Sequence, residues 1–122
     1  MNMDYLRFVQ NYKNDINSLN SNIETVKFFR KDIVSFLIWF CVLEHYYNND
    51  YDNDNDNIEN IMTEIPKEYA SRPTIFKIID DAVSKKFFKK TISSNDKRKY
   101  HLFPTTQTIN EFEEWAKRIK VF

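Results

Sequence analysis

The stretch SRPTIFKIIDDAVSKKFFKKTISSNDKRKYHLFPT, residues 71–105, decides the fold of this chain. Ser71 is a residue type that favours the N-cap position of a helix, and Pro73 has a fixed φ that suits the first helical turn. Apolar residues then recur at the three- and four-residue spacing of a helix with one buried face. The expected members of that face are Ile75, Ile78, Ile79 and Val83.

After this helix the pattern changes to that of a β-hairpin. Residues 87–93 and 99–103 have the composition of strands, and the polar residues 94–98 between them predict a turn. The turn is basic. A helix followed at once by a basic-tipped hairpin is the layout of a winged helix, and it indicates DNA binding.

Two motifs in this stretch resemble those of MarR-type transcriptional regulators. Asp96-Lys97-Arg98, followed after five residues by Pro104-Thr105, is similar to the D-x-R…L-T wing signature of that family. Residues 71–77, SRPTIFK, resemble the S-x-P-T-V-T-R opening of the family's recognition helix. The strict resemblance covers about 35 of the 122 residues, and the chain departs from the family at Lys86, where the family has Gly, and at Pro104, where it has Leu.

The resemblance implies that the first turn of the helix enters the major groove of double-stranded DNA. Basic side chains there can donate to guanine or to phosphate. Phe76 takes the place of a hydroxyl residue, and it could touch a thymine methyl group or lie against the wing. In the family, the aspartate at the position of Asp96 pairs with a wing arginine, so Asp96 is expected to be structural. The expected DNA contacts are Ser71, Arg72, Thr74 and Lys77 in the helix and Lys97, Arg98 and Lys99 in the wing.

The net charge is zero, but the two halves of the chain carry opposite charge. Residues 1–65 contain 5 basic and 11 acidic residues, whereas residues 66–122 contain 13 basic and 7 acidic residues. The basic excess lies between Lys67 and Lys99, with 10 basic and 4 acidic side chains. This asymmetry favours nucleic-acid contact, because the basic residues fall on the helix start and the hairpin tip.

Residues 1–27 are expected to form a long N-terminal helix with a narrow apolar stripe of heptad-like spacing. A capping box from Ser21 to Glu24 allows a break near Asn20. Packing within the chain would explain the stripe, but the resemblance implies that the terminal helices, including residues 106–122, form a homodimer. The stripe comprises Tyr5, Val9, Tyr12, Ile16, Leu19, Ile23 and Val26; the expected dimerisation residues are the first five of these, with Ile109, Phe112, Trp115 and Ile119 in the last helix.

Residues 28–105 are expected to contain the winged helix itself. Residues 33–43 are apolar almost all round, which predicts a buried central helix with Cys41 as a small core residue. The Asp- and Asn-rich residues 48–57 have no apolar periodicity, which predicts a solvated loop. Asp52, Asp54 and Asp56 imitate the ligands of a calcium-binding loop, but Asn57 and Thr63 replace its glycine and glutamate. Residues 58–65 predict a short helix, ended by Pro66, that forms a helix-turn-helix pair with the helix after Ser71.

Several classes of protein are disfavoured by composition. The chain has no glycine, so glycine-rich phosphate-binding loops are absent. With one cysteine and with His45 and His101 in no ligand or catalytic spacing, we expect no enzyme activity, no metal site and no cofactor. The apolar run 34–43 is too short to span a membrane. The expected location is cytoplasmic and nucleoid-associated.

The sequence thus predicts a mainly α fold with a small β-hairpin wing: a single winged helix-turn-helix domain, residues 1–122, with N- and C-terminal dimerisation helices. The expected function is that of a dimeric transcriptional regulator that binds double-stranded DNA sequence-specifically. Two alternatives stay open: a winged-helix adaptor that binds protein, and an architectural DNA-binding protein without sequence preference. Whether a small-molecule effector exists also stays open.

Overall fold

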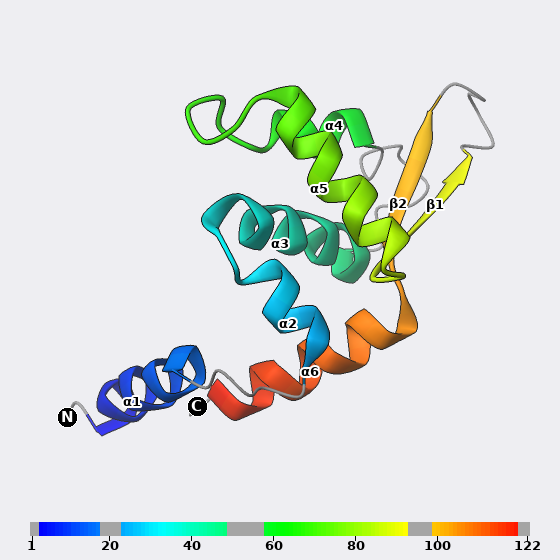
Figure 1. Cartoon of the computed structure of the whole chain (residues 1–122). Helices are drawn as coiled ribbons and strands as arrows, with labels where there is room; N and C mark the ends of the chain where they lie inside the picture. The colour runs from blue at the N-terminus through cyan, green and yellow to red at the C-terminus, as the bar shows by residue number, and fades with distance from the viewer. Residues whose placement is uncertain (1–2, 18–22, 49–57, 93–98, 120–122) are drawn as a thin grey trace.

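The computed structural model describes residues 3–17, 23–48, 58–92 and 99–119. Within them it contains six helices and one two-stranded antiparallel sheet, which confirms the expected mainly helical fold with a small hairpin. α3 lies in the middle, with α4, α5 and the hairpin on one side and α2 and α6 on the other (Figure 1). The elements are α1 (Met3–Asn17), α2 (Glu24–Phe29), α3 (Ile33–Asn48), α4 (Ile58–Thr63), α5 (Arg72–Ser84), β1 (Phe88–Ile92), β2 (Tyr100–Pro104) and α6 (Thr106–Ile119).

The core is built around α3, the central helix that the sequence predicts. Ile38, Trp39 and Val42 of this helix are fully buried. The Trp39 ring stacks on Phe29 of α2 with the ring centroids 5.5 Å apart, and its centroid lies 5.3 Å from that of Trp115 in α6. Because such rings bury large apolar areas, these contacts fix α2 and α6 against α3.

Cys41 and His45 of α3 are both buried in the interior of the protein. Cys41 is buried, and burial, together with the nearby carboxylates of Glu64 and Glu44, raises the pKa of its thiol to about 12. The thiol therefore stays protonated at neutral pH, as expected of a core cysteine. Nε2 of the buried His45 lies 3.0 Å from Oε2 of Glu64, which ties α3 to the turn after α4.

α4 ends at Thr63, two residues earlier than the sequence pattern predicts. The Ile65 amide donates to the Met62 carbonyl over 3.3 Å, so the chain leaves the helix through a tighter turn. The proline ring of Pro66 disfavours helical backbone at Ile65, which explains the early end. The Asp- and Asn-rich loop that precedes α4 lies outside the described residues from position 49 to position 57.

The start of α5 is the one that the sequence predicts. Ser71 is the N-cap, and its Oγ accepts a hydrogen bond of 3.4 Å from the Thr74 amide. Ile75 and Ile79 are buried on the inner face of α5, with Ile78 partly buried beside them.

The end of α5 has an unusual backbone conformation. Lys86 has φ of 65°, in the left-handed region that favours glycine. Its amide donates to the Val83 carbonyl, and the Phe87 amide donates to the Ala82 carbonyl, a hydrogen-bond pair that defines a Schellman motif. Lys86 thus adopts a glycine conformation at the place where the chain departs from the MarR-type pattern.

β1 and β2 pair from Phe88 opposite Pro104 to Ile92 opposite Tyr100, within a residue of the predicted bounds. Phe88 lies in the core at the base of the hairpin, whereas Ile92 and Tyr100 near its outer end are exposed. Thr105 follows β2 and caps α6: its Oγ1 accepts from the Thr108 amide at 3.4 Å.

Residues 1–27 contain two helices rather than one continuous helix, and the interval between them includes Asn20, where the sequence allowed a break. α1 ends at Asn17 and α2 begins at Glu24; Asn20 and Ser21 lie between them, outside the described residues. The N-cap of α2 is Ile23, whose side chain makes no capping hydrogen bond. Glu111 of α6 supplies the cap instead, because its Oε1 accepts from the amide of Thr25 at 2.9 Å and from Thr25 Oγ1 at 2.6 Å.

Candidate nucleic-acid interface

The start of α5 and the outer end of the hairpin lie at the same end of the molecule, at the top of Figure 1. Asp80 of α5 and Lys90 of β1 join the two elements, with Lys90 Nζ 3.4 Å from Asp80 Oδ1. Lys90 Nζ also lies 5.5 Å from the centroid of the Tyr100 ring on β2. These contacts hold the hairpin beside α5, as a DNA-binding surface made of both would require.

Arg72, the first residue of α5, is held from two sides. Its Nη2 lies 2.9 Å and 3.1 Å from the two carboxylate oxygens of Glu59 in α4. Its guanidinium carbon lies 5.8 Å from the centroid of the Phe76 ring, within the range of a cation–π contact. Phe76 itself is half-buried and packs against the core. The Arg72 side chain remains 59% exposed, so an oriented cation faces solvent at the start of the helix.

The two hydroxyl residues of this turn are engaged with each other. Ser71 Oγ lies 3.1 Å from Thr74 Oγ1, in addition to its capping contact. Both residues are exposed. Their first role is to fix the helix start, and contact with a ligand would have to be made without breaking the cap.

The structure describes only some of the remaining predicted contact residues. Lys77 is exposed on α5, and Lys99 is exposed immediately before β2. Lys97, Arg98 and Asp96 lie outside the described residues. The described part of the predicted site therefore consists of the helical contact residues of α5 and of Lys99 at the outer end of the hairpin.

A hollow of about 400 Å³ lies between α4 and the start of α5. Its lining is apolar inside and carries two cationic side chains. The lining residues are Met62, Thr63, Ile65, Lys67, Ala70, Ser71, Arg72 and Ile75.

The predicted dimerisation residues divide into two groups. Trp115 and Ile119 of α6 are buried within the same chain, and Ile109 and Phe112 are partly buried, so α6 has little apolar surface left for a partner. Tyr5, Val9 and Ile16 of α1 are exposed and Tyr12 is half-buried, whereas Leu19 lies outside the described residues. Ile23 and Val26, which continue the stripe in the sequence, are core residues.

Sequence reasoning missed Glu59. It is 13 positions from Arg72, across a turn between two helices, so no local spacing predicts the pair. Only the packing of α4 against α5 brings the first turns of these two helices together. The sequence left open whether Phe76 would touch a thymine methyl group or lie against the wing. In the structure its ring packs against the core and lies 5.8 Å from the guanidinium carbon of Arg72.

In the part of the chain that the structure describes, no group of three or more His, Cys, Asp or Glu side chains could hold a metal ion. Within the same residues, no helix combines the length and the apolar character needed to cross a bilayer. Comparison of the chain with protein-family models, with curated proteins and with solved structures found no match.

Proposed function

We propose that this chain is a winged helix-turn-helix protein that binds double-stranded DNA sequence-specifically, with α4 and α5 as the helix-turn-helix and the β1–β2 hairpin as the wing. The observation that carries the proposal is the orientation of Arg72 by Glu59 and Phe76 at the first turn of α5. An arginine held in this way can present two donors to the O6 and N7 atoms of guanine. A mobile lysine would only neutralise phosphate.

The surroundings of Arg72 suit the DNA backbone. The positive end of the α5 helix dipole favours phosphate, and Lys77 is exposed on the same helix. Lys99, with Lys97 and Arg98 in the sequence before it, would contact phosphates or a narrow minor groove beside the major-groove site. The carboxylate of Glu59 would repel phosphate, and this penalises docking in which Arg72 does not reach a base.

The biological role that follows is transcriptional regulation by occupation of an operator, in keeping with the resemblance to MarR-type regulators. As a two-fold dimer, the protein would present two α5 helices to half-sites about one helical turn of DNA apart. A second candidate, a protein-binding adaptor, is favoured by one observation: the exposed apolar side chains of α1. An adaptor would show no DNA binding.

The test is selection of bound fragments from random duplex DNA, followed by binding titrations on the selected and on unrelated sequences. Arg72→Ala should weaken binding to the selected site by about 1–3 kcal/mol. Arg118→Ala is the matched control, because Arg118 is 48% exposed and pairs with Glu114 at 2.9 Å, but lies on α6. Failure to enrich any sequence, or equal effects of both variants, would refute sequence-specific binding through α5.

A further inference from the structure

α1 is attached to the rest of the chain by its C-terminal half. The Asp15 carboxylate pairs with Arg30, the residue that directly follows α2, and accepts a hydrogen bond of 2.7 Å from Trp115 Nε1. Arg30 Nη2 also donates to the Asp15 carbonyl at 2.9 Å, and the Tyr12 ring meets the Trp115 ring edge-on at 6.3 Å. The N-terminal half of α1 projects away from the body of the molecule (Figure 1).

The projecting half carries apolar side chains in solvent. Tyr5 is 65% exposed and Val9 is 59% exposed, and no described residue of α1 is buried. Both lie on the same face of the helix as Tyr12 and Ile16, because the spacing of four, three and four residues keeps them in one stripe. A helix with such a face is stable in water when a partner covers it.

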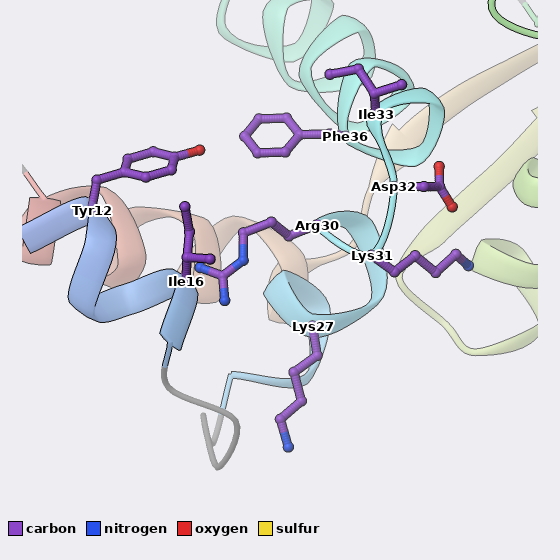
Figure 2. Close-up of a pocket in the computed structure, with 8 residues that line it drawn as sticks. All are labelled: Tyr12, Ile16, Lys27, Arg30, Lys31, Asp32, Ile33 and Phe36. Carbon is purple, nitrogen blue, oxygen red and sulfur yellow. The ribbon is translucent and has the colours of Figure 1, made fainter. Parts of the chain in front are cut away.

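A wedge-shaped hollow of about 600 Å³ opens beside the attached half of α1, between α1, α2 and the start of α3. Figure 2 shows Tyr12 and Ile16 of α1 and Phe36 and Ile33 of α3 around its apolar part. Arg30, which directly follows α2, points toward this part, whereas Lys27 of α2 points away from it. Ile33 is 64% exposed, which shows that no described part of the chain fills the hollow.

The order of the stripe is palindromic. The intervals from Tyr5 to Val9, to Tyr12 and to Ile16 are four, three and four residues. If two copies of α1 pair antiparallel about the midpoint of this series, Tyr5 of one copy lies opposite Ile16 of the other, and Val9 lies opposite Tyr12. Each projecting half then meets the other copy's attached half, as a self-complementary two-fold interface requires.

From this geometry we infer that the hollow receives the projecting half of α1 from a second copy of the chain. Tyr5 and Val9 of each copy enter the wedge lined by Tyr12, Ile16 and Phe36 of the other. Asp4 lies on the same flank of α1 as Asp15, so in this register the second copy's Asp4 arrives on the side of Lys27, whereas Arg30 is already paired with Asp15. The dimer is therefore made by α1 and the wedge, and the buried residues of α6 take no part in it.

The inference does not depend on DNA binding and is tested without DNA. The mass of the full chain is measured by light scattering at low micromolar concentration, for the wild type, for Ile16→Glu and for Asn14→Glu. Asn14 lies on the opposite, polar face of α1, so Asn14→Glu adds the same charge away from the stripe. We expect dimers for the wild type and Asn14→Glu and a folded monomer for Ile16→Glu. A monomeric wild type, or a dimeric Ile16→Glu protein, would overturn the inference.

The direction of pairing is tested by disulfide formation in a Cys41→Ala background. The double variant Tyr5→Cys, Ile16→Cys should form covalent dimers under mild oxidation, because the two positions meet across the interface. The single variant Tyr5→Cys should not, because the two Tyr5 positions lie about 16 Å apart along the helix axis in the antiparallel register. Efficient cross-linking of the single variant would show parallel pairing and overturn the proposed wedge.

Discussion

Glu59 and Arg72 are joined across the turn between α4 and α5 by two contacts of 2.9 Å and 3.1 Å. Both side chains are 59% exposed, so the pair contributes little to folding stability. Its consequence is geometric: the carboxylate and the Phe76 ring restrict the guanidinium to one region of the surface. A restricted arginine can discriminate between bases, since less side-chain entropy is lost when it binds.

Glu59→Gln should therefore change DNA specificity more than stability. Removing the carboxylate charge should strengthen binding to random duplexes, because a repulsion with phosphate disappears. The ratio between selected and random affinity should fall by about tenfold, since Arg72 loses its orientation. Glu68→Gln, which removes the same charge from the turn before α5, should strengthen both affinities and leave their ratio unchanged. A ratio that is unaffected by Glu59→Gln would contradict the positioning role.

Lys86→Gly should stabilise the protein. The left-handed φ of 65° brings the lysine Cβ close to the backbone, and glycine has no Cβ. The expected gain is about 0.5–1 kcal/mol after the larger entropy of unfolded glycine is subtracted. Urea titration should show a higher midpoint at an unchanged slope. Lys85→Gly, at an ordinary φ of −82°, should bring no gain, and a gain of equal size there would show that the left-handed conformation is not the cause.

Glu111→Gln should change the acid sensitivity of the fold. Burial acts to raise the pKa of Glu111, but hydrogen bonds from Thr25 and Gln107 outweigh it and lower the pKa below the ordinary 4.5. The folded state then holds fewer protons than the unfolded state, so the stabilisation is present above pH 4.5 and is lost as the pH falls through the folded pKa. The difference in Tm between wild type and Glu111→Gln should be largest at pH 6 and shrink toward pH 3. A difference in Tm that is independent of pH for Glu111→Gln would exclude the proposed linkage.

Cys41 should be unreactive in the folded protein. Its pKa of about 12 leaves very little thiolate at pH 8, and the thiol is also buried. Alkylation by iodoacetamide at pH 8 should be at least a hundredfold slower in buffer than in denaturant. Rates within tenfold of each other would indicate that α3 opens readily.

Trp115→Ala should destabilise the folded chain. The Trp115 ring is 4% exposed, contacts Trp39 and donates to Asp15, so its removal should lower the free energy of unfolding by about 3–5 kcal/mol. Leu6→Ala, at a position 49% exposed and outside the stripe, should change it by less than about 0.5 kcal/mol. If the Trp115→Ala protein is stable but does not dimerise, Trp115 belongs to the dimer interface, as the sequence predicts.

Local sequence determined the elements whose signals are short in range. The cap at Ser71, the buried face at Ile75 and Ile79, and the all-round apolar α3 follow from backbone chemistry and periodicity, which act within a few residues. The hairpin was predictable for the same reason, since segments of strand-like composition flank a polar turn. These features decide that the fold is mainly helical with one small hairpin.

The tertiary structure decided everything that depends on residues distant in the chain. The apolar stripe continues from Ile16 to Ile23 and Val26 in the sequence, but α1 ends at Asn17, and Ile23 and Val26 lie in the core. There α2 is capped by Glu111, 86 positions from Thr25. The stripe of α6 has the same apolar character as that of α1, yet α6 packs on α2 and α3 while α1 stays exposed. Periodicity shows that a face needs covering, and only the packing of all elements shows whether the chain covers it.

The candidate site divides in the same way. The sequence by itself places Arg72 at a helix start and concentrates basic residues from Lys67 to Lys99. It does not predict the contact of Arg72 with Glu59 or with the Phe76 ring, because those contacts depend on the angle at which α4 and α5 meet. That angle is set by the buried residues between the two helices and α3, and their joint packing free energy is a property of the folded chain that no local pattern contains.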